Sequence, residues 1–184
     1  MNMYIIRHGE SDKNLLNLIQ GQSNSNLTSQ GIVQMELTKK ALNNIIFSAI
    51  YSSDQHHAYQ STRILKNINV NTPIIMTKML RERNLGKLEG LKKDILNIEI
   101  EGVESIENLM IRANTFIKMI TSKYKDETIL IVAHGAIICA IVSTLMKVSF
   151  DTKYKMKDIC NSSITIFEPV PHMMTFSSIS HLEN

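Results

Sequence analysis

Two apolar runs in this sequence end at the same dipeptide, His-Gly, and each leads into the start of a helix. The first run is MYIIR before His8 and Gly9, and the second is ILIVA before His134 and Gly135. Short apolar runs that stop abruptly at turn residues are typical of buried β-strands. Strands that alternate with helices form a largely parallel sheet with helices on both faces. We therefore predict an α/β fold.

The rest of the pattern supplies further elements in the same order. Strands are predicted over residues 47–53, 72–77 and 127–133, and helices over 27–42, 57–68, 105–124 and 136–148. Thr28 is the expected N-cap of the first helix, with Val33, Leu37 and Ala41 on one apolar face. Residues 162–180 predict two strands joined by a proline-containing turn, a hairpin at the sheet edge. Because no linker or repeat divides the chain, we expect a single domain over residues 1–184.

Composition restricts the class of partner. Hydrophobic residues make up 43% of the chain, and the formal net charge of +3 is spread among interspersed acidic and basic residues. A mixed, solvated surface is expected, with no nucleic-acid or membrane partner. Cys139 and Cys160 lie far apart in the sequence, and Cys139 stands in an apolar run. Neither a disulfide framework nor a signal peptide is predicted, so we expect a cytoplasmic protein.

The two histidines that follow the strands predict a site at the sheet edge. If the two strands are neighbours, His8 and His134 emerge side by side beyond their carboxyl ends, where open parallel sheets bind ligands. Gly9 and Gly135 would let the backbone approach a ligand, and helix N-termini favour an anion. Arg7 adds a cation whose fork fits phosphate. Imidazole is a competent nucleophile near neutral pH, so this pattern favours phosphoryl chemistry over simple strand capping.

Attack on a phosphomonoester also requires an acid for the leaving oxygen. Glu82 lies between Arg81 and Arg83 in a loop that Gly86 and Gly90 close. From this segment alone, a surface salt-bridge cluster is the better interpretation of Glu82.

Taken together, these residues resemble the histidine phosphatase superfamily, in its phosphoglycerate mutase-like branch. RHGESDKN at 7–14 is similar to the family's RHGE-T/S-x-x-N signature, and further similar segments follow in family order along nearly the whole chain. These are QG at 20–21, LTxxG at 27–31, AIYSSD at 49–54, AxQ(S/T)T at 58–62, RERNLGKLEG at 81–90, EGVESIE at 101–107, VAHGAI at 132–137 and NSSIT at 161–165.

The resemblance implies a three-layer α/β/α sandwich and catalysis through a phosphohistidine without a metal or other cofactor. By position in the motifs, His8 corresponds to the nucleophile and Glu82 to the proton donor that later activates water. Arg7 and His134 correspond to residues that stabilise charge on the transferring phosphoryl group.

The same resemblance implies a pocket lining. Asn14, Gln20 and Gly21 would line the phosphate pocket, together with Gly135 and the residue at position 57.

This chain departs from the family pattern at His57, where the resemblance implies a second phosphate-binding arginine. Loss of one bidentate contact made in the transition state costs about 2–4 kcal/mol. Arg63, Arg81 or Arg83 could compensate, although Arg63 should point away from the face of His57. If His57 serves as a cation, activity should rise toward mildly acidic pH. The neighbouring His56 is interpreted as surface filler, and no metal site is predicted for the pair.

The second departure is length. Few residues separate Gly90 from Glu101, where a longer pocket-covering insertion is common in the family, and no extended C-terminal tail follows. A mutase must shield its phosphorylated intermediate from water, so a short lid favours hydrolysis. We expect a phosphatase acting on a small phosphorylated metabolite. The alternatives are a phosphoglycerate mutase-type phosphotransferase and a low-activity member that binds phosphorylated ligands.

Overall fold

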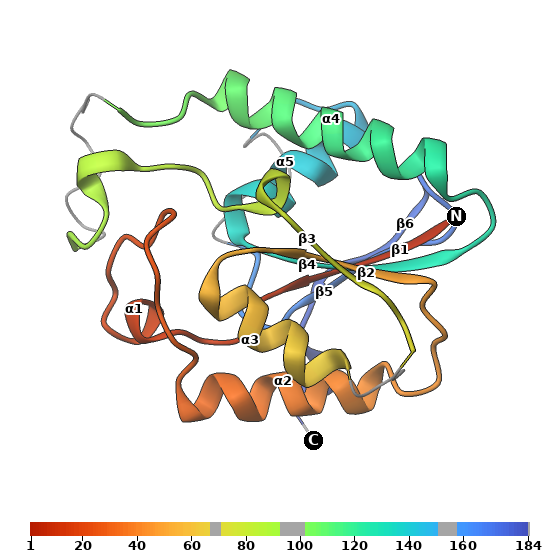
Figure 1. Ribbon diagram of the computed structural model, residues 1–184, viewed down its shortest axis with the longest axis horizontal. Coiled ribbons are helices and arrows are strands. Elements are labelled where there is room, and N and C mark those ends of the chain that lie inside the picture. The colour runs from red at the N-terminus through yellow and green to blue at the C-terminus, as the bar shows by residue number, and fades with distance from the viewer. Residues whose placement is uncertain (67–70, 93–101, 151–157, 184) are drawn as a thin grey trace.

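The computed structural model describes residues 1–66, 71–92, 102–150 and 158–183, and these form a six-stranded sheet between two layers of helices (Figure 1). The strands are β1 (Asn2–Arg7), β2 (Ala49–Ser53), β3 (Ile74–Thr77), β4 (Thr128–Ala133), β5 (Ile164–Phe167) and β6 (Met173–Ser178), in the spatial order β3-β2-β4-β1-β5-β6. The pairs β1–β4, β2–β4 and β2–β3 are parallel, and β5 pairs antiparallel with both β1 and β6. The predicted α/β/α sandwich with an antiparallel hairpin at the sheet edge is confirmed.

The sheet separates two cores because its side chains alternate between faces. Met3 and Ile5 of β1 point to the core that contains α4 (Ile106–Lys123) and α5 (Gly135–Met146). Ile6 points to the opposite core, against α2 (Ser29–Ala41) and α3 (His56–Leu65). In Figure 1, α4 and α5 accordingly lie above the sheet, and α2 and α3 lie below it.

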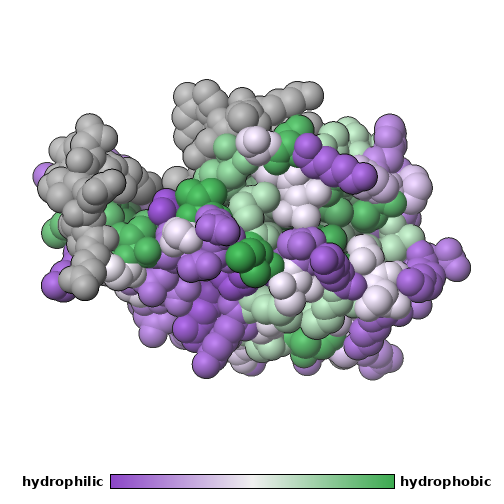
Figure 2. Space-filling view, turned by 90° about the horizontal axis from the view of Figure 1, so that it is seen from above, coloured by the Kyte–Doolittle hydropathy of each residue, from purple (hydrophilic) through white to green (hydrophobic). Residues whose placement is uncertain are grey.

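Helix α5 is buried almost all round, with ten of its residues buried, Cys139 among them. The sequence between 105 and 124 repeats apolar residues at three- and four-residue spacing, which predicts a buried stripe on this helix. The stripe is confirmed, since Leu109, Ala113, Phe116 and Ile120 are all fully buried. The outer face over α4 mixes hydrophilic and hydrophobic residues, as Figure 2 shows from that side.

The predicted face of α2 is wrong, although its N-cap is right. Thr28 accepts a hydrogen bond from the Gly31 amide, whereas Val33 is 51% exposed. The buried side chains of the helix are those of Met35 and Thr38 instead. A close backbone approach sets this rotation, because a Cβ added at Gly31 would lie 2.1 Å from the carbonyl oxygen of Glu10. The helix therefore packs against the loop that follows β1 through Gly31, not through its valine and leucine.

Candidate active site

The pairing of β1 with β4 brings His8 and His134 together. The two strands are parallel, with Arg7 opposite Ala133, so both histidines leave the same edge of the sheet one residue later. The His8 amide donates to the Ala133 carbonyl at 3.1 Å, and the two imidazole centroids lie 5.1 Å apart. Both side chains are buried. The predicted juxtaposition is confirmed.

His57 supplies a third imidazole from the first turn of α3. Its ring centroid lies 4.3 Å from that of His8 and 4.9 Å from that of His134. Its Nε2 lies 3.1 Å from His134 Nδ1. His57 is fully buried while His56 is exposed, as their places on the helix require. Of the histidine pair, only His57 belongs to the site.

One hydrogen bond fixes the tautomer of His8. Its Nδ1 lies 2.7 Å from the carbonyl oxygen of Gly9, which can only accept, so Nδ1 carries the proton and Nε2 keeps its lone pair. Burial, followed by electrostatic interactions with His57, His134 and Arg7, lowers the pKa of His8 well below its usual 6.5. The ring is therefore neutral and nucleophilic at neutral and mildly acidic pH.

His57 is not an imidazolium in this pocket. Burial is the main cause that lowers its pKa to about 3, with the positive charge of Arg7 next. Burial therefore disfavours a cationic His57 at mildly acidic pH. Burial and then the charges of His57 and Arg7 lower the pKa of His134 in the same way. A neutral imidazole thus stands at position 57, where the resemblance implies a second arginine.

Arg7 is the fixed cation among these rings. Its Nη1 donates to the Ile159 carbonyl at 2.5 Å, and its buried Nε has no hydrogen-bond partner among the described residues. Burial lowers its pKa, which the carboxylate of Glu82 partly offsets, but a guanidinium still stays protonated. A buried, unpaired N–H beside three imidazoles is a donor that an anion would satisfy.

The candidate arginines for compensation are engaged elsewhere. Arg81 makes a two-pronged ion pair with Asp54, with both N···O distances at 2.7 Å. Arg83 donates to the Glu104 carbonyl, and exposed Arg63 donates to the hydroxyl of Tyr59. Lys13, which the sequence reasoning missed, acts on the pocket instead, because its charge is one of those that lower the pKa of His57.

The residues predicted to line the pocket form a connected network. The Gln20 side-chain amide nitrogen lies 2.6 Å from His57 Nε2, and its oxygen accepts from Ser11. Asn14 Oδ1 accepts from the Asn161 amide at 3.0 Å. Gly21 has φ +52, a left-handed conformation that favours glycine. A Cβ there would also lie 2.2 Å from the Glu89 carboxylate.

Glu82 reaches the same strand edge through its loop. Its carboxylate accepts hydrogen bonds from the Ala136 amide at 3.0 Å and from the Arg83 amide at 2.9 Å. Ala136 is in the first turn of α5, which Gly135 begins directly after His134. Burial raises the pKa of Glu82, and these backbone bonds and the Arg7 charge oppose the rise. A carboxyl with a raised pKa suits an acid that works near neutral pH.

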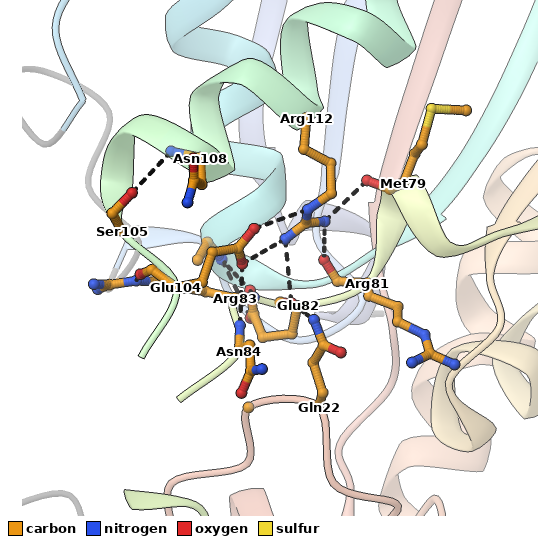
Figure 3. Close-up of polar contacts among 12 residues, drawn as sticks. Gln22, Met79, Arg81, Glu82, Arg83, Asn84, Glu104, Ser105, Asn108 and Arg112 are labelled. Atoms are coloured by element: carbon orange, nitrogen blue, oxygen red, sulfur yellow. Dashed lines mark hydrogen bonds and ion pairs between the residues drawn. The ribbon is translucent and has the colours of Figure 1, made fainter. Parts of the chain in front are cut away.

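Arg112 of α4 anchors the Glu82 loop (Figure 3). Its guanidinium donates to the carbonyl oxygens of Met79, Arg81 and Glu82, and it pairs with Glu104 at 2.8 Å. The sequence reasoning missed Arg112, and the only available signal was an arginine on the inner stripe of a predicted helix. It also missed Gln55, whose amide joins the Glu82 backbone to the Gly21 carbonyl.

The salt-bridge cluster suggested for this segment is present only in part. Arg81 pairs with Asp54, but Glu82 is half-buried and makes no ion pair with its neighbours in the described chain. The predicted short lid lies largely outside the described residues, since 93–101 are not among them.

Comparison with known proteins agrees with this geometry. The family model of the histidine phosphatase superfamily (branch 1) matches residues 3–180. The chain therefore belongs to the histidine phosphatase superfamily.

Individual relatives include both phosphatases and mutases. The chain is 26% identical over 201 residues to a metal-independent phosphoserine phosphatase of Arabidopsis thaliana, covering 98% of this chain and 82% of that protein. It is 31% identical over 166 residues to a 2,3-bisphosphoglycerate-dependent phosphoglycerate mutase of Cytophaga hutchinsonii, covering 80% and 78%.

Among solved structures, it resembles the phosphoserine phosphatase of Entamoeba histolytica in complex with 3-phosphoglyceric acid. The TM-score is 0.86 at 26% identity, with 98% of both chains covered. Within the described residues, no helix has the length and apolar character needed to cross a membrane.

The burial of His57 predicts sensitivity to acid. The unfolded chain binds a proton at His57 near pH 6.5, but the folded chain does not until about pH 3, so the free energy of unfolding falls as pH drops. At pH 5 this contribution reaches about 2 kcal/mol. We expect His57→Gln to reduce the pH dependence measured by urea unfolding between pH 7 and pH 5. His56→Gln is the exposed control, and an equal pH dependence in His57→Gln and wild type would contradict the assignment.

Proposed function

We propose that this protein is a metal-independent phosphatase that hydrolyses small phosphomonoesters through a phosphohistidine on His8. The observation that carries the proposal is the fixed His8 ring. Gly9 holds the Nδ1 proton, so the Nε2 lone pair is available in a buried pocket beside Arg7. Neutral imidazole in this tautomer is ready to attack phosphorus without first losing a proton.

In the first step, His8 Nε2 forms a bond to phosphorus as the ester P–O bond breaks. Glu82, whose pKa is raised by burial, acts in its acid form and gives its proton to the leaving oxygen. Arg7 and neutral His134 donate hydrogen bonds to the phosphoryl oxygens as charge develops on them. Asn14, Gln20, Gly21, His57 and Gly135 line the pocket around that group.

In the second step, water attacks phosphorus and the P–N bond to His8 breaks. Glu82, now a carboxylate, accepts the proton of the water and returns to its acid form. Free phosphate leaves, and the His8 ring regains its neutral tautomer with the proton on Nδ1. Every group returns to its starting state without a metal or other cofactor.

The relatives support a small phosphorylated substrate but include two reaction types. A phosphoserine phosphatase and a phosphoglycerate mutase are both similar to this chain over most of its length. The short lid inferred from the sequence favours the hydrolase, because water must reach the intermediate. A cytoplasmic location is part of this proposal and is supported by the cysteine usage of the chain.

Turnover assays test the proposal directly. Wild type should release phosphate over many cycles from p-nitrophenyl phosphate and from phosphoserine. His8→Ala should fall below roughly a thousandth of the wild-type rate, and Glu82→Gln should lose about 10²–10⁴ in kcat. His56→Ala, at the exposed neighbour of His57, is the matched control. Isomerisation of 3-phosphoglycerate without net phosphate release would identify a mutase, and binding without turnover would identify the low-activity alternative.

A series at position 57 measures what the missing cation costs. His57→Arg should raise kcat/KM at pH 7.5 by up to about 10²-fold, because it restores a two-pronged contact to phosphate. His57→Lys, which adds charge without the fork, should give a smaller rise, and neutral His57→Gln should give none. If His57→Arg leaves the rate unchanged, another cation such as Lys13 already compensates for the substitution.

A further inference from the structure

The three imidazoles of the pocket are arranged as ligands for a metal ion. His8, His57 and His134 each offer one ring nitrogen, and these three atoms lie within 4.8 Å of one another. The described chain buries all three side chains, with at most 2% of any of them exposed. In a tetrahedral site with Zn–N bonds of about 2.0–2.1 Å, neighbouring ligand nitrogens stand roughly 3.3 Å apart. The 3.1 Å separation between His57 Nε2 and His134 Nδ1 is already near that value.

Each ring is also held at its second nitrogen, as the ligands of natural metal sites are. His8 Nδ1 donates to the Gly9 carbonyl at 2.7 Å, and His134 Nε2 lies 2.7 Å from the hydroxyl oxygen of Ser53. His57 Nδ1 lies 3.0 Å from the side-chain amide nitrogen of Gln20. The nitrogens that would bind an ion are therefore Nε2 of His8, Nε2 of His57 and Nδ1 of His134. The Gln20 amide nitrogen, which lies 2.6 Å from His57 Nε2, would have to turn away.

Metal binding requires neutral imidazoles and a change of tautomer at one of them. A single proton must move, because the contact between His57 Nε2 and His134 Nδ1 needs a hydrogen on one of them. His134 loses the proton on Nδ1 to solvent and takes up another on Nε2. The new Nε2–H then donates to the hydroxyl oxygen of Ser53, and the net charge of the ring is unchanged.

The charged neighbours act in both directions. Arg7 and Lys13 oppose a cation in the pocket, and Glu82 favours one when its carboxyl group is ionised. An arginine at position 57 would add a second positive charge and remove one ligand. Compared with arginine, the histidine at position 57 therefore favours a metal ion in two ways, because it avoids a positive charge and supplies a ligand.

We infer that His8, His57 and His134 bind one divalent transition-metal ion of the Zn²⁺ class, and that this ion inhibits the enzyme by occupying the nucleophile. The ion would take the Nε2 lone pair of His8, the same electron pair that attacks phosphorus. Its fourth position stays open to water or to an oxygen of inorganic phosphate. The metal ion therefore takes no part in catalysis, because the proposed catalytic cycle needs no metal.

Calorimetric titration of chelator-treated protein with ZnCl₂ at pH 7.5, without substrate, tests the site. Wild type should bind one equivalent, and His57→Gln and His57→Arg should each weaken binding by more than about 100-fold, since loss of an outer hydrogen bond alone costs 10–100-fold. His56→Gln should bind as wild type does. Circular dichroism confirms that each variant is folded. Co²⁺ in place of Zn²⁺ should give the intense visible bands of a four-coordinate site in wild type and in His56→Gln, but not in His57→Gln or His57→Arg.

Two results would overturn the inference: no stoichiometric Zn²⁺ binding up to millimolar concentration, or equal binding by His57→Gln and wild type. Because calorimetric binding and the Co²⁺ spectrum are measured without turnover, they test the metal site independently of the proposed phosphatase activity. In the activity assay, Zn²⁺ should inhibit wild type. High substrate concentration should weaken this inhibition, and EDTA should reverse it. His57→Arg should be inhibited much less than wild type. Activation by Zn²⁺ would contradict the binding of the ion to His8.

Discussion

The site depends on the parallel pairing of β1 with β4. The register that sets Arg7 opposite Ala133 also brings His8 beside His134, because each histidine is the first residue beyond its strand. A shift of one residue would turn the alternating side chains of β1 to the wrong core, so burial on both faces of the sheet fixes the register. The geometry of the pocket is in this way enforced by the apolar residues beneath it.

Burial then sets the chemistry of the pocket. The same exclusion of water that keeps His8 neutral and nucleophilic also keeps His57 neutral, which costs the pocket a positive charge. Arg7 remains the cation of the pocket. Lys13, in α1 (Asp12–Leu15), adds a positive charge that lowers the pKa of His57. A pocket with this balance can still bind a phosphoryl group, but it also gains affinity for a metal ion.

Sequence patterns predicted the parts of this molecule that depend on local order. The two strand–His–Gly segments predicted the juxtaposition of His8 and His134, and three- and four-residue spacing predicted the buried stripe of α4. The buried face of α2 could not be read this way, because a backbone contact at Gly31 rotates the helix toward Met35. The protonation of His57 was equally hidden, since it follows from burial by residues distant in the sequence. The same holds for Arg112, whose partners come from another segment.

The central claim is that the phosphoryl group passes through a covalent intermediate on His8. Stereochemistry at phosphorus tests it most directly, with a thiophosphate monoester made chiral by oxygen isotopes and hydrolysed in isotopically labelled water. Each in-line displacement inverts phosphorus, so two successive displacements return the original configuration. We predict overall retention in the inorganic thiophosphate released. Overall inversion would show a single direct attack by water and would contradict the phosphohistidine.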